Sequence, residues 1–284
     1  MAIYPHILVA EGGGMRNVFA AGVLDRFLAQ GFDPFDLCMG VSSGAGNLAA
    51  FMAGMPGRNL LIYTSYFLDP EFISVRKFLR GGHLMDLDWM WEKTIADVRL
   101  DLKTIYSRGR PFLVCLTDVD TGQAVYKPTR AGNLEAVLKA SSALPVIYRG
   151  FPRIDGRPYT DGGISDPLPV KTALALGGKK IMVIRSRPAA YMKKEAMTQA
   201  LLRLAFAKYP ALAGAAASRV DRYNAAVKTI QYPPKGVDII QVSPPDGLDL
   251  GRLSRNRGRI LSTYLLGKAA GDKAILDWQQ GEDK

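Results

Sequence analysis

A serine between two glycines is the clearest chemical signal in this chain. Residues 40–44 read Gly-Val-Ser-Ser-Gly, a G-x-S-x-G pattern in which Ser42 would sit on a sharp strand-to-helix turn with its hydroxyl exposed. About thirty residues earlier, three consecutive glycines at 12–14 are followed by a cation, Arg16. Such a turn presents backbone N–H groups to an anion. Together the two motifs indicate acyl transfer chemistry on a serine nucleophile.

The base that would activate Ser42 is not expected to be a histidine. The chain has only two. His6 opens the apolar run 6–10, which is typical of a buried strand entering the glycine turn. Because sites in open α/β sheets lie at the carboxyl ends of strands, His6 would be roughly 15 Å away, at about 3.3 Å per residue. His83 lies in a segment without strand pattern and suits a surface or helix-cap role. A carboxylate is therefore the expected base.

Asp161 is the best candidate for that carboxylate. Two glycines follow it and would permit close backbone approach, although an aspartate before glycine is also common in ordinary turns. Asp118 and Asp120 are rivals, because they end the predicted strand 111–117 and could reach the same edge of a sheet. A hairpin turn would explain Asp120 equally well.

The ordered set of motifs resembles the patatin-like phospholipase family. The resemblance consists of a glycine-rich turn with a basic residue, then G-x-S-x-G, then Asp-Gly-Gly. The segments 117–122, 140–145 and 161–170 also resemble the family, and the whole match covers about residues 6–185. Glu11 before the glycines and a C-terminal helical extension resemble a bacterial subgroup.

The resemblance implies a Ser–Asp dyad in which Ser42 is the nucleophile and Asp161 is the base. The other site residues that it implies form the oxyanion turn and the elbow: Gly12, Gly13, Gly14 and Arg16, with Gly40 and Gly44. The implied reaction is hydrolysis of a lipid ester, of phospholipase A or lysophospholipase type, through an acyl-enzyme and without metal or cofactor. One departure is Asn17, because members of the family often carry glycine at this position.

An aspartate is a weak base for this task, so its surroundings must compensate. Its ordinary pKa is about 3.9 against about 6.5 for histidine, a difference of roughly 3.5 kcal/mol. Burial would raise the pKa of Asp161, and each preorganised N–H donor at the oxyanion is worth about 3–4 kcal/mol. The glycine turn and the N–H of Ser43 are the expected donors. We expect Arg16 to hold the turn through hydrogen bonds to backbone carbonyls.

Strand and helix patterns alternate along the chain, which favours an α/β fold with a mostly parallel sheet and helices on both faces. The resemblance adds a three-layer, patatin-like arrangement with a helical C-terminal extension. Strands are predicted at 6–10, 36–41, 111–117, 123–127, 180–185 and 237–242, and a hairpin within 145–159. Helices are predicted at 17–30, 44–55, 59–80, 89–106, 132–141, 168–176, 190–229 and 254–277. Residues 1–284 are interpreted as one domain with a motif core at about 6–185 and an extension at about 190–284.

The segment 59–106 is rich in aromatic residues and methionine. It could form an apolar lid or acyl pocket beside Ser42. Packing of helices into the core is the simpler explanation for most of these side chains.

The chain is basic, with 37 Lys and Arg against 26 Asp and Glu and a net charge of +11. Nucleic-acid motifs with interleaved aromatic residues are not evident, so no nucleic-acid partner is expected. For a lipid hydrolase, peripheral contact with an anionic membrane is the most economical explanation, and residues 252–259 and Lys193-Lys194 are candidate contacts. A solvated surface would explain these clusters equally well. The oligomeric state stays open.

The N-terminal residues show neither a basic region nor a long apolar run, so no signal peptide is expected. No run of about 18 apolar residues occurs either, so no membrane span is expected. Cys38 and Cys115 lie in apolar strand runs and suit the core better than a disulfide or a metal site. These features predict a cytoplasmic protein, at most peripheral at the inner membrane surface.

Two other functions remain open at this stage. A non-catalytic lipid- or membrane-binding protein could keep the fold, although the intact serine, aspartate and glycine turn argue against it. A nucleotide-binding protein is disfavoured because no G-x-x-x-x-G-K-[ST] occurs and the glycine turn lacks the last glycine of G-x-G-x-x-G. The natural ester, the acyl position cleaved and the choice between hydrolysis and acyl transfer are not determined by the sequence.

Overall fold

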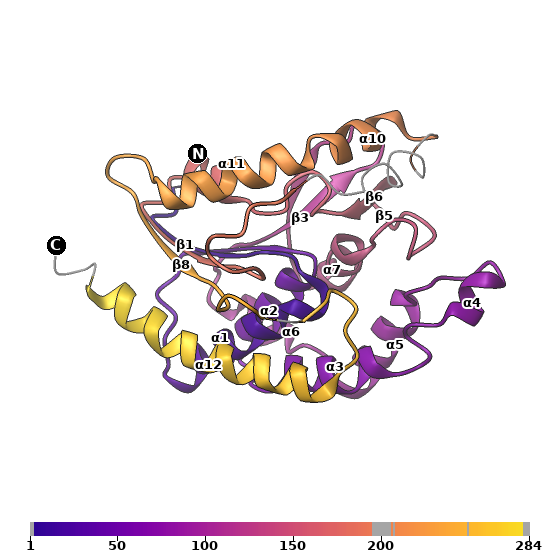
Figure 1. Cartoon of the computed structure of the whole chain (residues 1–284), viewed down its shortest axis with the longest axis horizontal. Coiled ribbons are helices and arrows are strands. Elements are labelled where there is room, and N and C mark those ends of the chain that lie inside the picture. Colours follow the sequence, from indigo (N-terminus) through magenta and orange to yellow (C-terminus); the bar gives the residue numbers. More distant parts are fainter. Residues whose placement is uncertain (1–2, 195–205, 207, 249, 281–284) are drawn as a thin grey trace.

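The computed structural model describes residues 3–194, 206, 208–248 and 250–280. Its centre is an eight-stranded sheet with helices on both faces, as predicted (Figure 1). The strands are β1 (His6–Ala10), β2 (Leu37–Val41), β3 (Phe112–Asp118), β4 (Ala124–Pro128), β5 (Arg153–Ile154), β6 (Arg157–Asp161), β7 (Lys180–Ile184) and β8 (Asp238–Val242). Five of them, β3, β2, β1, β7 and β8, pair in parallel in that order. Strands β4, β5 and β6 are antiparallel additions at the β3 end.

Two apolar clusters hold the layers together. Strands of an all-parallel sheet bury both faces, which explains why β1, β2 and β7 are almost continuously apolar and buried. One cluster packs α1 (Val18–Ala29), α2 (Ser43–Met52) and α7 (Leu134–Ser142) on one face. The other packs α8 (Val170–Ala175) and α11 (Arg219–Gln231) on the opposite face. In Figure 1, α11 lies above the sheet, whereas α1 and α2 lie below it.

The C-terminal region is part of this architecture. Strand β8 extends the parallel sheet beside β7, and α12 (Arg257–Gln280) runs along α1 (Figure 1). The two helices approach closely at glycines: a Cβ on Gly267 would lie 2.1 Å from the Phe19 carbonyl oxygen. Near its end, Trp278 is buried in the core against Phe35, with ring centroids 5.1 Å apart. The extension therefore contributes to the same core as the motif region.

Three of the long predicted helices are wrong, because local signals interrupt them. Segment 59–80 contains α3 (Arg58–Thr64), the 3-10 turn η2 (Tyr66–Leu68) and α4 (Val75–Leu79). Pro70 disfavours helical backbone at Asp69, which is extended, and Ser74 then caps α4.

Segment 89–106 divides into α5 (Leu87–Val98) and α6 (Leu102–Ser107), because the Asp101 side chain caps the Thr104 N–H at 3.1 Å. Within 190–229, residues 191–194 are not helical, and α10 (Pro210–Ala217) is separate from α11. The remainder of that prediction, 195–205 and 207, lies outside the described residues. None of the helices in the described parts of the chain is long and apolar enough to cross a bilayer.

One pairing detail positions the site. Strand β4 occupies one edge of β3 from Leu113 to Thr117. On the other edge, β2 ends with Val41 opposite Cys115, and β6 ends with Asp161 opposite Leu116. Because β2 is parallel to β3 and β6 is antiparallel to it, the two strands meet end to end on that edge. The residues that follow β2 and terminate β6 are thereby brought together.

Candidate active site

Ser42 occupies a strained turn between β2 and α2, as the G-x-S-x-G pattern predicts. Its φ is +53°, in the left-handed region that non-glycine residues rarely adopt. The turn is crowded, since a Cβ on Gly44 would lie 2.4 Å from the Glu11 carbonyl oxygen. The Ser42 N–H donates to Ser141 Oγ at 2.8 Å, and Ser141 Oγ donates to the Cys115 carbonyl at 2.7 Å. Strand β3 thus holds the strained turn through Ser141, which lies in the family-like segment 140–145 but was not predicted as a site residue.

Asp161 lies beside Ser42 and is 3% exposed. Its carboxylate shares a small cavity with the Ser42 side chain and accepts the Gly163 N–H at 2.7 Å. Burial raises the pKa of Asp161 above its ordinary value, while the Ser42 side chain, the Gly163 N–H and the charge of Arg219 oppose that rise. A raised pKa is the change that a carboxylate needs to act as a base near neutral pH. The structure brings together the two residues that the sequence paired.

The rival acids and the histidines lie elsewhere. Asp118 Oδ1 accepts the N–H groups of Asp120 and Thr121, both at 3.0 Å, within the β3–β4 turn. His6 contacts Asp36 at the opposite end of β1. His83 stacks on Tyr148 at 4.1 Å between ring centroids. None of these lines the cavities that contain Ser42 in the described part of the chain.

The glycine turn lies directly against the nucleophile. A Cβ on Gly12 would be 3.1 Å from the Ser42 Cβ. The Gly13 and Gly14 N–H groups donate to Ser43 Oγ at 3.1 and 2.9 Å. The sequence did not predict this role of the Ser43 side chain. In this conformation Ser43 Oγ accepts hydrogen bonds from two of the N–H groups that were expected to face an oxyanion.

Asn17, the departure from the family pattern, supports the same arrangement. Its Nδ2 donates to Ser43 Oγ at 2.9 Å and to the Glu11 carbonyl at 2.6 Å. The side chain is fully buried at the start of α1. It therefore ties the turn to the residue after the nucleophile, which a glycine could not do.

Arg16 does not make the contacts that we expected. Its side chain is buried, yet none of its nitrogens hydrogen-bonds a backbone carbonyl of the described residues, and Nε has no partner. It lines a separate cavity behind the glycine turn together with Glu11. The expected support through carbonyls is therefore wrong, and Asn17 and Ser43 hold the turn instead.

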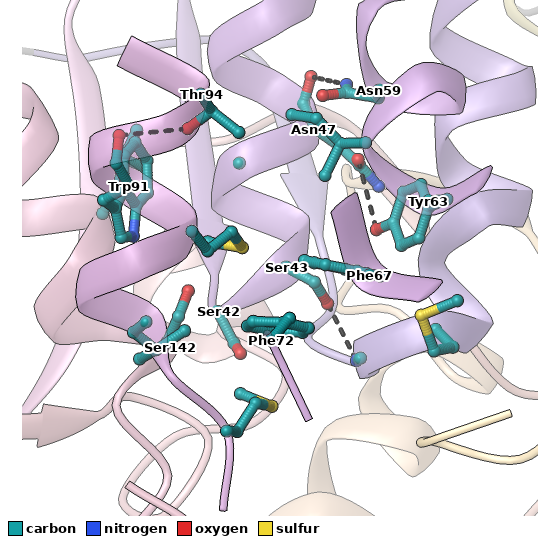
Figure 2. A pocket seen from close by; sticks show the side chains of 18 of the residues that line it. Ser42, Ser43, Asn47, Asn59, Tyr63, Phe67, Phe72, Trp91, Thr94 and Ser142 are labelled. Atoms are coloured by element: carbon teal, nitrogen blue, oxygen red, sulfur yellow. Dashed lines mark hydrogen bonds between the residues drawn. The ribbon is translucent and has the colours of Figure 1, made fainter. Parts of the chain in front are cut away.

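An apolar pocket of about 900 Å³ opens beside Ser42 (Figure 2). Part of segment 59–106 forms its wall, which supports the acyl-pocket interpretation of that segment for these residues. The lining residues from the segment are mainly apolar: Ile62, Tyr63, Phe67, Phe72, Ile73, Met85, Leu87, Met90, Trp91 and Leu100. Tyr66, Phe78 and Trp89 do not line it.

Two arginines near Ser42 were not predicted as site residues. Arg219 begins α11 and Arg252 lies between β8 and α12, and both line a cavity of about 290 Å³ with Ser42, Asp161 and the glycine turn. Arg219 Nε donates to the Gly163 carbonyl. Arg252 belongs to the basic run 252–259, which had been considered only as a surface feature. Its local sequence carries no motif, so only the tertiary structure reveals it.

Comparison with known proteins defines the class. A family model described as patatin-like phospholipase matches residues 8–174, and the chain belongs to this family. A second model, described as a domain of unknown function, matches residues 209–281, which include α10, α11, β8 and α12. The match confirms the resemblance, and it indicates a lipid acyl hydrolase family.

Similar proteins extend over most of the chain. YjjU, an uncharacterized protein of Escherichia coli (strain K12), is 35% identical over 269 residues, which are 93% of this chain and 75% of YjjU. An NTE family protein of Mycobacterium tuberculosis (strain H37Rv) is 29% identical over 177 residues, 58% of this chain and 45% of that protein. Among solved structures, VipD from Legionella pneumophila matches with a TM-score of 0.47 at 13% identity, covering 96% of this chain and 67% of VipD.

Proposed function

We propose that this protein is a serine acyl hydrolase that cleaves lipid esters, of phospholipase A or lysophospholipase type. The observation that carries the proposal is a buried aspartate beside a serine in a strained elbow, at the side of an apolar pocket. The family membership supports the same class of reaction. We further propose peripheral contact with an anionic membrane, from which the substrate would enter the pocket.

In the first step, Ser42 Oγ attacks the ester carbonyl and its proton passes to the Asp161 carboxylate. The tetrahedral intermediate collapses to an acyl-enzyme, and the alcohol leaves with a proton from Asp161. In the second step, Asp161 takes a proton from the water that attacks the acyl carbonyl, and it returns this proton to Ser42 Oγ as the fatty acid is released. Both steps need only these two side chains and donors for the oxyanion.

The donors come from the glycine turn and the start of α2. In the free protein, Ser43 Oγ accepts the Gly13 and Gly14 N–H groups and so keeps the turn ordered. Rotation of the Ser43 side chain would free both amides for the oxyanion, with the Ser43 N–H at the helix N-terminus as a further donor. Gly12 lies against Ser42 and would set the distance between the Gly13 and Gly14 N–H groups and the reacting carbonyl.

Labelling with a fluorophosphonate tests whether Ser42 is an activated nucleophile. Intact mass is measured for the wild type and Ser42→Ala after incubation with the probe, with and without anionic liposomes. One adduct on the wild type that is absent from the variant is the expected result. A folded wild type that stays unlabelled under both conditions would contradict the proposal and favour a non-catalytic lipid-binding protein.

The pH dependence of hydrolysis provides a second test. Asp161 acts as a base only when it is ionised, so kcat/KM should fall when the pH drops below the pKa of Asp161. Because burial raises that pKa, the fall should occur at a pH above about 3.9, the pKa of an ordinary aspartate. The measurement is kcat/KM against pH with an uncharged short-chain ester. If the residual activity of Asp161→Asn falls at the same pH as the activity of the wild type, the fall is caused by the titration of a group other than Asp161.

A further inference from the structure

A second cavity, of about 310 Å³, lies behind the glycine turn and is unusually rich in cations. Five basic side chains line it: Arg16, Arg187, Lys193, Arg219 and Arg252. One carboxylate, Glu11, and the rings of Tyr191 and Tyr223 complete the charged and aromatic part of the wall. Arg219 and Arg252 also line the cavity that contains Ser42 and Asp161, so the two spaces adjoin.

Within the described parts of the chain, these cations lack close acidic partners that would neutralise them. In the described residues, none of the five forms an ion pair within 4 Å. Glu11 is already engaged, because its Oε2 accepts the Ser186 N–H at 2.8 Å and lies 3.9 Å from Arg185 Nε. Arg16 Nε is buried without a hydrogen-bond partner. The cavity therefore presents an excess of positive charge, which Glu11 and Asp161 offset only in part, and an unused donor at Arg16 Nε.

The arrangement is electrostatically unfavourable in the empty protein. Burial, then the charges of Arg252 and Arg187, lowers the pKa of Arg16 to about 10. Burial, then Arg252, lowers the pKa of Arg219 to about 10. Burial, then Arg219 and Arg252, lowers the pKa of Lys193 to about 7. Burial is the largest cause of each shift, and repulsion between the charged side chains adds to it, so a bound anion would offset both effects.

Aromatic rings hold two of the cations in place. Arg187 lies over the Tyr191 ring at 4.6 Å, and Lys193 lies over the Tyr223 ring at 4.8 Å. The Tyr223 ring is itself fixed, because its hydroxyl accepts a hydrogen bond from Arg185 at 2.8 Å. Rings orient the cations without neutralising them, so the donors remain available to a ligand.

We propose that this cavity is a phosphate-binding subsite beside the nucleophile. Planar guanidinium groups bind phosphate oxygens in pairs, and four arginines with one lysine match a doubly charged tetrahedral anion. Arg252 also lines the apolar pocket, so a ligand with its ester at Ser42 would have an acyl chain on one side and a phosphate on the other. The proposal deepens the proposed function, and it assigns selectivity to residues from the C-terminal part of the chain.

Binding is tested separately from hydrolysis. Inorganic phosphate is titrated against Ser42→Ala at constant ionic strength set with chloride, and affinity is read by calorimetry. Arg187 and Lys193 line the subsite but not the Ser42 cavity. Arg187→Gln and Lys193→Gln, each added to Ser42→Ala, should therefore weaken phosphate binding by about tenfold or more. Lys194→Gln, an exposed neighbour, is the matched control. Absence of phosphate binding, or equal affinity in all variants, overturns the proposal.

Hydrolysis then distinguishes the source of the phosphate. Monoacylglycerol phosphate and monoacylglycerol of the same chain length are compared in active protein, with inorganic phosphate as competitor. If the substrate supplies the phosphate, Arg187→Gln and Lys193→Gln lower kcat/KM for monoacylglycerol phosphate by about tenfold relative to kcat/KM for monoacylglycerol. Inorganic phosphate then raises KM for the phosphate-bearing ester alone. If free phosphate is the ligand, it changes both reactions equally. Phosphate binding without hydrolysis of either ester would refute the proposed function and leave the subsite standing.

Discussion

Asp161→Asn is expected to lower kcat for ester hydrolysis by about 10²–10⁴-fold, the usual contribution of a positioned general base. Asparagine keeps the size of the side chain and can still accept the Gly163 N–H, but it cannot take the Ser42 proton. Steady-state kinetics with a soluble ester measure the effect. Asp118→Asn is the matched control, because Asp118 caps the β3–β4 turn and should leave kcat unchanged.

The same substitution should stabilise the protein at neutral pH. Because burial raises the pKa of Asp161 in the native state, its ionisation lowers the free energy of unfolding as the pH rises above about 3.9, the ordinary value, and this loss is complete above the raised pKa. The substituted asparagine would not ionise, so the variant should melt at a higher temperature than the wild type at neutral pH, and the difference should vanish below about pH 3.9. A variant with wild-type kcat would show that Asp161 is not the base.

Gly46→Phe is expected to abolish hydrolysis of long-chain esters while sparing acetyl esters. Gly46 lies on α2 at the wall of the apolar pocket, and a Cβ there meets nothing within 4 Å. A phenylalanine can therefore project into the space meant for the acyl chain. Each excluded methylene removes about 0.8 kcal/mol of transfer free energy, so losing four lowers kcat/KM by about 10²-fold. The measurement is kcat/KM for 4-nitrophenyl esters of increasing chain length.

Gly46→Ala is the control for this experiment. Its single methyl group fits the open space and leaves most of the pocket free, so its chain-length profile should follow that of the wild type. Equal losses on acetyl and long-chain esters in Gly46→Phe would mean that the substitution disturbs the elbow, and that the pocket does not hold the acyl chain.

The reactive pair could be predicted from the sequence because its chemistry is local. Ser42 lies in a motif whose glycines are required by the turn itself, and the scarcity of histidines directed attention to Asp161. The strands of the parallel core were predicted to within one or two residues, since buried strands leave continuous apolar runs. The first helix, predicted at 17–30, is followed by Gly31 with φ +62°, a backbone conformation that glycine adopts readily at helix ends.

The remaining features depend on contacts between distant segments. Strand β6 consists of only five residues, and only its pairing with β3 brings Asp161 to Ser42. The cations Arg219 and Arg252 lie in segments whose local patterns indicate nothing but surface. The long helices were overestimated because an apolar pattern continued across Pro70 and Asp101, where a proline or a side-chain cap ends the hydrogen-bond ladder.

Because β2 and β6 meet end to end on β3, the spacing of Ser42 and Asp161 does not depend on the segment that forms much of the pocket wall. The two reacting groups are 119 positions apart in the chain, yet their spacing is set by adjacent residues of one strand, Cys115 and Leu116. The intervening segment 59–100, which forms much of the pocket wall, contributes no strand to the sheet and is not paired with Cys115 or Leu116. Insertions, deletions or exchanges in this segment would therefore reshape the pocket wall while the spacing between Ser42 and Asp161 stays the same.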